Sequence, residues 1–328
     1  MQRIGLVGCG FMGRMHATVY GQLPNAQLVA VCDHREEKAK KFGDDFGAEW
    51  TTSFAEMVAR DDIDAIDICL PTFLHAQTTI DAARAGKHIL CEKPMALTTD
   101  EADQMIVECD QAGIKLMIGH CIRFWPEYAI LKGLVESKQL GELRSATFLR
   151  YGEFPSWSSD NWLADESKSG GGVLDMHIHD TDFALYICGE PHSMFAAGTI
   201  DSHGPSHAFT TLQYPNCVIH LEGGWNLPNH TPFKMAFRAV FDRGAAIMDG
   251  GALTIYEQGK EPVIPEIPKM EAQGGGNISD LGGYYHEIKY FVDCLEQGKP
   301  FETVTAESSR SSLHLALREI EAIKSGGF

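Results

Sequence analysis

The chain has 328 residues, which leaves room for two domains of ordinary size, and its hydrophobic content of 44% is enough to build a core in each. Its formal net charge of −18 argues against a nucleic acid or an anionic membrane surface as a partner, because both would repel it. The nine cysteines form no Cys-x-x-Cys pair, and no apolar run approaches the roughly 18 residues of a membrane-spanning helix. We expect a cytoplasmic globular protein with reduced cysteines.

A strand, a glycine-rich turn and a helix are predicted at the N-terminus. The strand-forming run RIGLVG leads directly into Gly8-Cys9-Gly10-Phe11-Met12-Gly13, and a helical pattern follows. In this context Gly8 permits a tight turn, Gly10 lets the backbone approach a pyrophosphate, and Gly13 lets the helix pack closely on the strand. The pattern predicts that a dinucleotide binds here, with its phosphates at the helix N-terminus.

The second predicted strand, QLVAVCD, ends in Asp33, which lies twenty residues beyond Gly13. A carboxylate at this point can accept hydrogen bonds from the adenosine ribose hydroxyls and would repel a 2′-phosphate. His34 and Arg35 follow directly, and a nearby arginine can instead accommodate that phosphate. We predict that NAD is preferred to NADP, with Asp33 and His34 at the ribose.

Strand and helix patterns alternate as far as residue 121. Further strands are predicted near AEWTT, AIDICL, HILCE and IKLMIGH, with helices between them. Six strands joined by crossover helices make a doubly wound sheet, whose ligands bind at the carboxyl ends of the strands. Pro71-Thr72, Glu92-Lys93 and His120 stand at such ends. Lys93 would then lie beside a bound nicotinamide; the alternative is a solvated surface lysine.

Beyond a helix predicted near 126–138, the pattern changes to long runs with period-two alternation. Five strands are predicted, near RSATFLRYGEF, AFTTLQYP, CVIHLEGGW, FKMAFRAVFD and ALTIYEQ. A proline- and glycine-rich loop over 261–283 and two helices complete the chain. The fold class predicted is α/β: an N-terminal Rossmann doubly wound parallel sheet in residues 1–121, and a C-terminal α+β domain on a large, mainly antiparallel open sheet in residues 122–328.

The stretch GGGVLDMHIHD, residues 170–180, begins a helix that is predicted to end near Cys188. Residues three and four apart share a helix face, so Asp175, His179 and Asp182 form one stripe. His177 points away from His179, and no set of cysteines or carboxylates completes a tetrahedral site. We therefore predict no metal site here.

In this order, the motifs are similar to those of the glucose-fructose oxidoreductase, inositol dehydrogenase and rhizopine catabolism (Gfo/Idh/MocA) family. The resemblance is carried by GLVGCGFMGRMHA, CLPTFLHAQTTIDAARAGKHILCEKPMAL, RFWPEY, NWLADESKSGGGVLDMHIHDTD and GGYYHEIKYFVDCLEQGKP. It implies that Lys93, Asp175 and His179 meet beside the nicotinamide, and that the C-terminal domain binds substrate and builds dimers or tetramers through its sheet. It also suggests a cofactor lining, in which each residue has a loop or packing role as the alternative: Pro71, Thr72, His75, Glu92 and Arg123.

One departure from the family lies at Trp162-Leu163, where several relatives carry tryptophan and arginine. An arginine contact to cofactor or substrate is therefore missing from the pattern. Trp157 and Trp162 can stack on an apolar sugar face, and packing accounts for either equally well.

These residues suit an NAD-dependent dehydrogenase that interconverts a secondary alcohol and a ketone on a cyclic polyol or sugar. Hydride removal from the carbon requires the hydroxyl proton to leave, and a histidine such as His179 is suited to accept it because imidazole titrates near neutral pH. Asp175 can orient the hydroxyl or the imidazole, and Lys93 can hydrogen-bond the reacting oxygen. Two alternatives stay open: an NAD-dependent glycosidase on the same fold, and a dinucleotide sensor without catalysis.

Overall fold

A computed structural model describes residues 1–156, 158–267 and 281–326. The chain forms two compact units. Unit 1 comprises Met1–Phe124 with Lys269–Arg310, and unit 2 comprises Trp125–Pro268 with Ser311–Phe328. The single division at residue 121 expected from the sequence therefore differs from the structure, since a later part of the chain returns to unit 1.

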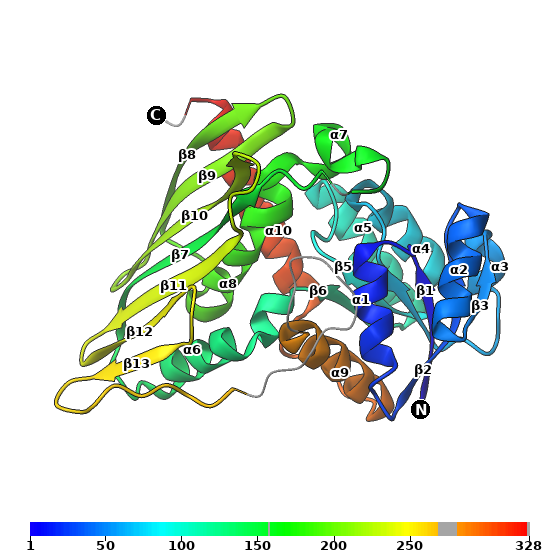
Figure 1. Cartoon of the computed structure of the whole chain (residues 1–328), viewed down its shortest axis with the longest axis horizontal. Helices are drawn as coiled ribbons and strands as arrows, with labels where there is room; N and C mark the ends of the chain where they lie inside the picture. Colours follow the sequence, from blue (N-terminus) through cyan, green and yellow to red (C-terminus); the bar gives the residue numbers. More distant parts are fainter. Residues whose placement is uncertain (157, 268–280, 327–328) are drawn as a thin grey trace. The chain divides into compact units, whose positions relative to one another are not determined.

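Unit 1 is built on a six-stranded parallel sheet in the order β3-β2-β1-β4-β5-β6 (Figure 1). The predicted doubly wound sheet is thus confirmed. The strands are β1 (Gln2–Val7), β2 (Ala26–Cys32), β3 (Glu49–Thr51), β4 (Ala65–Ile68), β5 (His88–Glu92) and β6 (Leu116–Gly119). The helices are α1 (Phe11–Tyr20), α2 (Glu36–Phe46), α3 (Phe54–Val58), α4 (His75–Arg84), α5 (Thr99–Ala112) and α9 (Gly282–Glu296), with short 3₁₀ turns η1 (Thr72–Leu74) and η2 (Cys121–Phe124).

The return of the chain to unit 1 has a packing cause. Helix α9 buries Ile288, Phe291 and Val292 in the same hydrophobic core as Leu6 of β1 and Val19 of α1. All five side chains are fully buried. The sequence showed α9 as an amphipathic helix but held no signal for which sheet its apolar face would cover.

Local signals define the helix ends as the sequence patterns predicted. In α5, Thr98 and Glu101 form a reciprocal capping box, which satisfies two backbone N–H groups at the helix start. Gly113 ends the same helix in the left-handed conformation, with a φ of 66°. Helix α5 lies between the strands β5 and β6, where the sequence pattern predicted a helix.

Unit 2 contains a seven-stranded sheet in the order β13-β12-β11-β7-β10-β9-β8. Every pair is antiparallel except β7 with β10, which is parallel. The strands are β7 (Leu143–Glu153), β8 (Ser193–Asp201), β9 (Gly204–Gln213), β10 (Val218–Leu227), β11 (Lys234–Phe241), β12 (Gly244–Asp249) and β13 (Thr254–Glu257). The helical segments are α6 (Pro126–Ser137), η3 (Ser159–Ala164), α7 (Glu166–Ser169), η4 (Val173–His177) and α8 (Ile178–Cys188), together with the part of α10 (Ala306–Lys324) that begins at Ser311.

Two strands, β8 and β12, were not predicted. Much of β8 is exposed at the edge of the sheet, and β12 begins with the small residues GAA, so neither shows strong hydrophobic alternation. Of the loop predicted over 261–283, residues 268–280 lie outside the described residues, and Val263 pairs with Ile255 of β13 through an isolated bridge.

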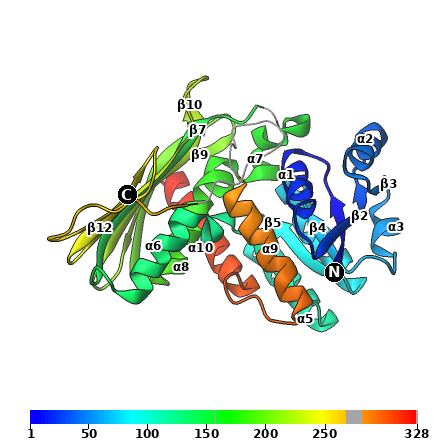
Figure 2. The ribbon, with the colours of Figure 1, turned by 60° about the horizontal axis from the view of Figure 1, so that its bottom comes forward.

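One face of the unit 2 sheet is covered by α6 and α8 (Figures 1 and 2). The core beneath them is aromatic. The ring centroid of Tyr128 on α6 lies 4.9 Å from that of Phe183 on α8 and 5.0 Å from that of Phe237 on β11. The opposite face exposes large hydrophobic side chains that the strand register places together: Phe195, Phe209, Val218, Val240 and Tyr256. None of the helices in the described part of the chain is long and apolar enough to cross a membrane.

Candidate active site

The glycine turn between β1 and α1 has the geometry expected of a phosphate-binding loop. Gly8 has a φ of 101°, and a Cβ there would lie 2.3 Å from the Cys69 carbonyl oxygen. A Cβ on Gly13 would lie 2.1 Å from the Gly8 carbonyl oxygen, so neither position accepts a side chain. A Cβ on Gly10, the N-cap of α1, would meet no atom within 4 Å. The backbone is therefore open at the helix N-terminus, where phosphate groups bind.

Asp33 lies just after β2 and is 5% exposed. Its carboxylate accepts hydrogen bonds from the backbone N–H groups of Cys9 at 3.2 Å and Arg35 at 3.0 Å. The Arg35 Nε lies 3.3 Å and the Lys38 Nζ 3.6 Å from it. Burial opposes its charge, but these donors and cations lower the pKa of Asp33, so the carboxylate is ionised at neutral pH. The exposed imidazole of His34 stands 3.4 Å away.

The residues after β4 form the next part of the same sheet edge. Pro71 precedes η1, which begins with the buried Thr72. His75 is 1% exposed, and its ring nitrogens each lie 2.8 Å from a carbonyl oxygen, Leu70 on one side and Pro94 on the other. These two contacts connect the loop after β4 to the loop after β5. They favour a packing role for His75 over direct contact with a cofactor.

Lys93 directly follows β5, at the carboxyl edge that also carries the glycine turn. Its side chain is half-buried, and its backbone N–H donates to Glu92 Oε2 at 3.0 Å. The Lys93-Pro94 peptide bond is cis. Arg123, in η2, donates from its guanidinium to the Thr303 carbonyl at 2.8 Å and to the Ser308 hydroxyl at 3.1 Å.

In unit 2, the glycine run before η4 lets the chain lie against the sheet. Gly170 and Gly171 have φ values of 74° and 78°, which favour glycine. A Cβ on Gly171 would lie 2.7 Å from the Pro205 carbonyl oxygen, and one on Gly172 would lie 2.6 Å from the Ser206 carbonyl oxygen. Gly171 and Gly172 thus allow close packing on β9, whereas a Cβ on Gly170 would meet the side chain of Leu174.

The helix predicted to run from this stretch to Cys188 is present, but its first turn is a π-helix, η4. Asp175 lies in η4 and His179 in α8, and both side chains are half-buried. Single π turns inside helices are frequent at functional sites. Asp175 and His179 therefore retain the partial exposure that contact with a substrate requires.

Two neighbours of this pair point into the core. His177 is fully buried, with Nε2 3.4 Å from the Glu319 carboxylate of α10 and 3.4 Å from the Thr210 hydroxyl of β9. The prediction that His177 faces away from His179 agrees with this placement. Asp182 was expected on the stripe of Asp175 and His179, but it is fully buried and accepts a hydrogen bond from Ser312 at 2.7 Å. Asp182 thus belongs to the contact between α8 and α10.

Trp162 lies in η3 and is half-buried, whereas Leu163 beside it is 3% exposed and packs in the core. An apolar side chain at 163 is therefore accounted for by burial. Trp157 lies outside the described residues.

Comparison with protein families decides the relationship. Residues 2–120 match the model described as "Oxidoreductase family, NAD-binding Rossmann fold", and residues 128–247 match the "GFO/IDH/MocA C-terminal domain". The chain belongs to the Gfo/Idh/MocA oxidoreductase family. It therefore has an NAD-binding Rossmann domain, and the resemblance inferred from the sequence motifs is confirmed.

Individual members of the Gfo/Idh/MocA family share much of the chain. Inositol 2-dehydrogenase from Rhizobium meliloti is 34% identical over 90% of this chain and 89% of its own. Levoglucosan dehydrogenase from Pseudarthrobacter phenanthrenivorans is 34% identical over 57% of this chain and 51% of its own. The chain spans about half the length of several curated relatives, among them this enzyme. A crystal structure of a putative myo-inositol dehydrogenase from Sinorhizobium meliloti, 25% identical, superposes with a TM-score of 0.80 over 98% of each chain.

The sequence motifs of the Gfo/Idh/MocA family did not reveal the buried ionic contacts around these residues. His16 bonds to Asp67 and Glu92 in unit 1, and Arg150 bonds to Asp180 in unit 2. A signal was present at Asp67, an acidic residue inside the apolar strand AIDICL, because a buried carboxylate requires a partner. Its partner could not be identified, since His16 is distant in the sequence.

Proposed function

We propose that the chain is an NAD-dependent oxidoreductase that interconverts a secondary alcohol and a ketone on a cyclic polyol or sugar. In the oxidative direction, the C–H hydride of the alcohol passes to the nicotinamide, and the hydroxyl proton passes to a protein base. The products are the ketone, NADH and a proton. The substrate class follows the relatives, which include dehydrogenases of inositol and of levoglucosan.

One observation carries the proposal: Lys93 follows β5 at the same edge of the sheet as the open glycine turn after β1. In parallel sheets of this order, a dinucleotide lies across the carboxyl ends of the strands. Gly8, Gly10, Phe11, Met12 and Gly13 would hold its phosphates and Asp33 its adenosine ribose. The lysine ammonium would then lie near the nicotinamide end, where it can donate a hydrogen bond to the reacting oxygen.

In this proposal the chemistry is divided among three residues. His179 takes the hydroxyl proton as the hydride leaves, since imidazole can accept it near neutral pH. Asp175, about one turn earlier, orients the substrate hydroxyl or the imidazole of His179. Lys93 stabilises the oxygen as it gains alkoxide character. The bound NAD supplies the hydride acceptor.

The preference for NAD over NADP rests on Asp33. Its carboxylate is ionised and held by two backbone N–H groups, so it stays where a ribose 2′-phosphate would be repelled. Arg35 and Lys38 already pair with Asp33, which reduces the positive charge that they offer to a phosphate. Arg35 and Lys38 nevertheless remain beside Asp33, so NADP would still bind, although more weakly than NAD.

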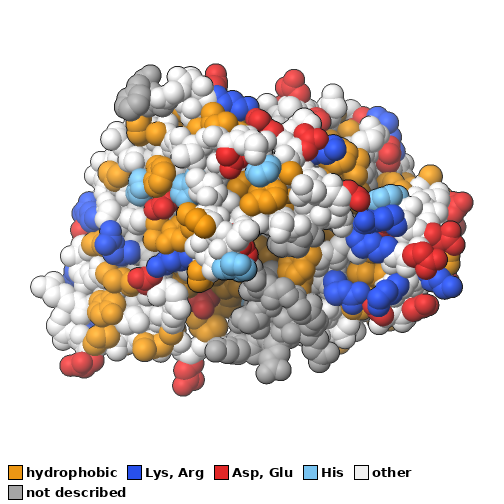
Figure 3. All heavy atoms as spheres, turned by 45° about the horizontal axis from the view of Figure 1, so that its top comes forward, with side chains coloured by type: hydrophobic (Ala, Val, Ile, Leu, Met, Phe, Trp, Pro, Cys, Tyr) orange, Lys and Arg blue, Asp and Glu red, His pale blue; other side chains and the backbone are white. Residues whose placement is uncertain are grey.

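We also propose that the exposed face of the unit 2 sheet joins copies of the chain into a dimer or tetramer. Phe195 is 52% and Phe209 42% exposed, and they lie on the same face. Figure 3 shows hydrophobic side chains open to solvent over the strands at the left of the view. Contiguous apolar surface of this kind marks protein interfaces. The nine cysteines, which are scattered along the sequence without a Cys-x-x-Cys pair, suit a reducing compartment such as the cytoplasm.

The proposal is tested by NADH fluorescence across inositols, hexoses and uronic acids, each with NAD and with NADP. Lys93→Gln and His179→Gln should each lower turnover at least about a hundredfold while NAD still binds. Lys41→Gln, an exposed lysine of α2, is the matched control and should leave turnover unchanged. Normal turnover in both Lys93→Gln and His179→Gln would overturn the mechanism. Release of an aglycone without net NADH would instead identify a glycosidase.

A further inference from the structure

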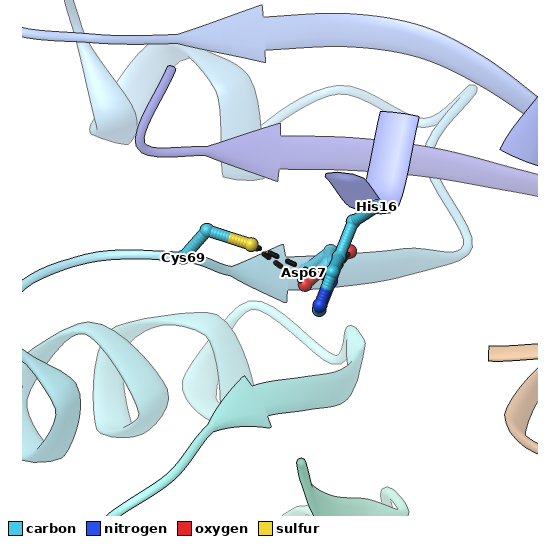
Figure 4. A group of neighbouring side chains, drawn as sticks. All are labelled: His16, Asp67 and Cys69. Carbon is cyan, nitrogen blue, oxygen red and sulfur yellow. Dashed lines mark hydrogen bonds and ion pairs between the residues drawn. The ribbon is translucent and has the colours of Figure 1, made fainter. Parts of the chain in front are cut away.

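Unit 1 contains a buried cluster of ionisable side chains, and Figure 4 shows three of its members, His16, Asp67 and Cys69. His16 projects from α1, Asp67 comes from β4, and Glu92 ends β5. The His16 Nδ1 lies 2.8 Å from Asp67 Oδ2, and its Nε2 lies 3.1 Å from Glu92 Oε1. His16 and Asp67 are fully buried and Glu92 is 5% exposed.

The arrangement of donors around His16 indicates its charge. A neutral imidazole has one N–H group and can donate to one carboxylate only, whereas an imidazolium can donate to both. Other donors reach the same two carboxylates: Tyr20 O–H donates at 2.9 Å to Asp67 Oδ2, the oxygen that His16 also contacts, and the Lys93 backbone N–H donates to Glu92 Oε2 at 3.0 Å. Two ionised carboxylates on one imidazolium satisfy every one of these contacts.

The same side chains could be considered as a metal site, because His16, Asp67 and Cys69 offer ligand atoms within 4.8 Å of one another. Ligand atoms about 2.0–2.1 Å from a tetrahedral metal are separated by about 3.3 Å, whereas His16 Nδ1 and Asp67 Oδ2 are 2.8 Å apart. The Cys69 thiol donates to Asp67 Oδ1 at 3.4 Å, and burial raises the pKa of this thiol, which opposes the thiolate that a metal requires. The distances are those of hydrogen bonds.

We propose that His16 is a positioning residue for Lys93. The His16 imidazolium, anchored by Asp67, fixes the Glu92 carboxylate, and the second oxygen of Glu92 holds the backbone N–H of Lys93. This orients the lysine toward the reacting oxygen. The inference rests on the proposed function, in which Lys93 contacts that oxygen. Replacement of His16 would remove the imidazolium that holds Glu92 Oε1, so the buried carboxylate would bind a proton more readily or move, and its hold on Lys93 would weaken.

Other titratable side chains lie in the same part of unit 1 as His16. Tyr20 on α1 and Cys69 after β4 both donate to Asp67, and Tyr284 on α9 has its ring centroid 6.3 Å from that of His16. Glu287, also on α9, is fully buried. Burial holds the pKa values of Tyr20 and Tyr284 well above their usual range, so neither phenol ionises under assay conditions. The charge of the cluster therefore depends on His16 and the carboxylates.

The experiment is a double-mutant cycle between His16 and Lys93. In the wild-type background, His16→Gln is expected to lower kcat about tenfold and to change the Kd for NAD less than about threefold. In the Lys93→Gln background, the same change should alter kcat less than about twofold, since the group it positions is gone. Glu92→Gln, which keeps the side-chain shape, should reproduce the loss if His16→Gln does not fold. Tyr20→Phe, which removes a donor to Asp67 and leaves the His16–Glu92 contact, should keep kcat within about twofold.

The outcomes separate this inference from the function on which it rests. Equal losses of kcat from His16→Gln in both backgrounds would overturn the positioning role and leave the role of Lys93 intact. Normal turnover in Lys93→Gln would overturn the proposed role of Lys93 and this inference with it, and normal turnover in His179→Gln as well would overturn the proposed mechanism. In addition, ¹⁵N-histidine NMR at neutral pH should show both ring nitrogens of His16 protonated, and a neutral tautomer would overturn the charge assignment.

Discussion

Gly172 offers a direct test of the argument that the glycine run lets the segment carrying Asp175 and His179 lie against the sheet of unit 2. A methyl group at this position would lie 2.6 Å from the Ser206 carbonyl oxygen and 2.9 Å from the Trp225 ring, closer than the 3.0 Å that real Cβ contacts observe. The φ of −62° suits alanine, so the cost of Gly172→Ala is steric alone.

The magnitude follows from what would have to move. Overpacking by a methyl group costs about 1–3 kcal/mol, and a clash with a backbone carbonyl belongs to the upper part of that range. Alanine returns about 0.5–1 kcal/mol through its lower backbone entropy, which leaves a net loss of about 1–2 kcal/mol. Displacement of the segment should also lower kcat about tenfold, because catalytic groups tolerate little misplacement.

Urea unfolding and steady-state kinetics measure both effects of Gly172→Ala. The matched control is Gly133→Ala, at an exposed position inside α6 where a Cβ would meet no atom within 4 Å. The control should gain about 0.5–1 kcal/mol and keep its kcat. A Gly172→Ala protein with wild-type stability and wild-type kcat would refute the packing argument.

Three further predictions concern buried or paired charges. Asp180→Ala leaves the buried Arg150 guanidinium without its counter-charge and should lower the free energy of unfolding by about 3–5 kcal/mol in urea. Asp33→Ser should raise the kcat/KM ratio of NADP to NAD at least about tenfold, measured with both cofactors, because the charge that repels a 2′-phosphate is removed. Burial opposes the charge of His16, but Asp67 holds the pKa of the His16 imidazole well above its usual value. The imidazolium therefore stabilises the fold fully below pH 6.5, and this stabilisation is lost as the pH rises through the folded-state pKa. The stability gap between wild type and His16→Gln should therefore narrow above pH 7 by up to about 1.4 kcal/mol per pH unit.

Much of unit 1 could be predicted because its signals are local. The strand RIGLVG, the glycine turn and the strand that leads to Asp33 are each recognisable from a few consecutive residues, and the structure has these elements where the sequence predicted them. Less of unit 2 could be predicted, because its strand pairing depends on contacts between distant parts of the sequence. The edge strand β8 has few inward-facing side chains, and the parallel pairing of β7 with β10 is set by register between distant segments. Periodicity in one strand carries no information about its neighbour.

Among the candidate site residues, the sequence separated exposed from buried positions only where helix geometry was enough. It placed His177 away from His179 correctly, because two residues correspond to nearly opposite sides of a helix. It did not predict the burial of Asp182, because the contact between Asp182 of α8 and Ser312 of α10 depends on tertiary packing. For His75 and Arg123, the contacts with backbone carbonyls depend on loops that the sequence did not position.

Each unit contains a buried histidine paired with a carboxylate, close in sequence to a residue to which we assign a chemical role. In unit 1, Glu92 pairs with His16 and directly precedes Lys93. In unit 2, His177 pairs with Glu319 and lies two residues before His179. Such pairs are weak evidence for stability, since the cost of desolvating the charges often exceeds their attraction, and apolar side chains of similar volume would serve the fold as well. What an apolar side chain cannot do is fix a carboxylate or a helix turn in one orientation through directional bonds. Positioning, rather than stability, is therefore the physical reason for a charged histidine under Lys93, and the cycle between His16 and Lys93 measures that contribution directly.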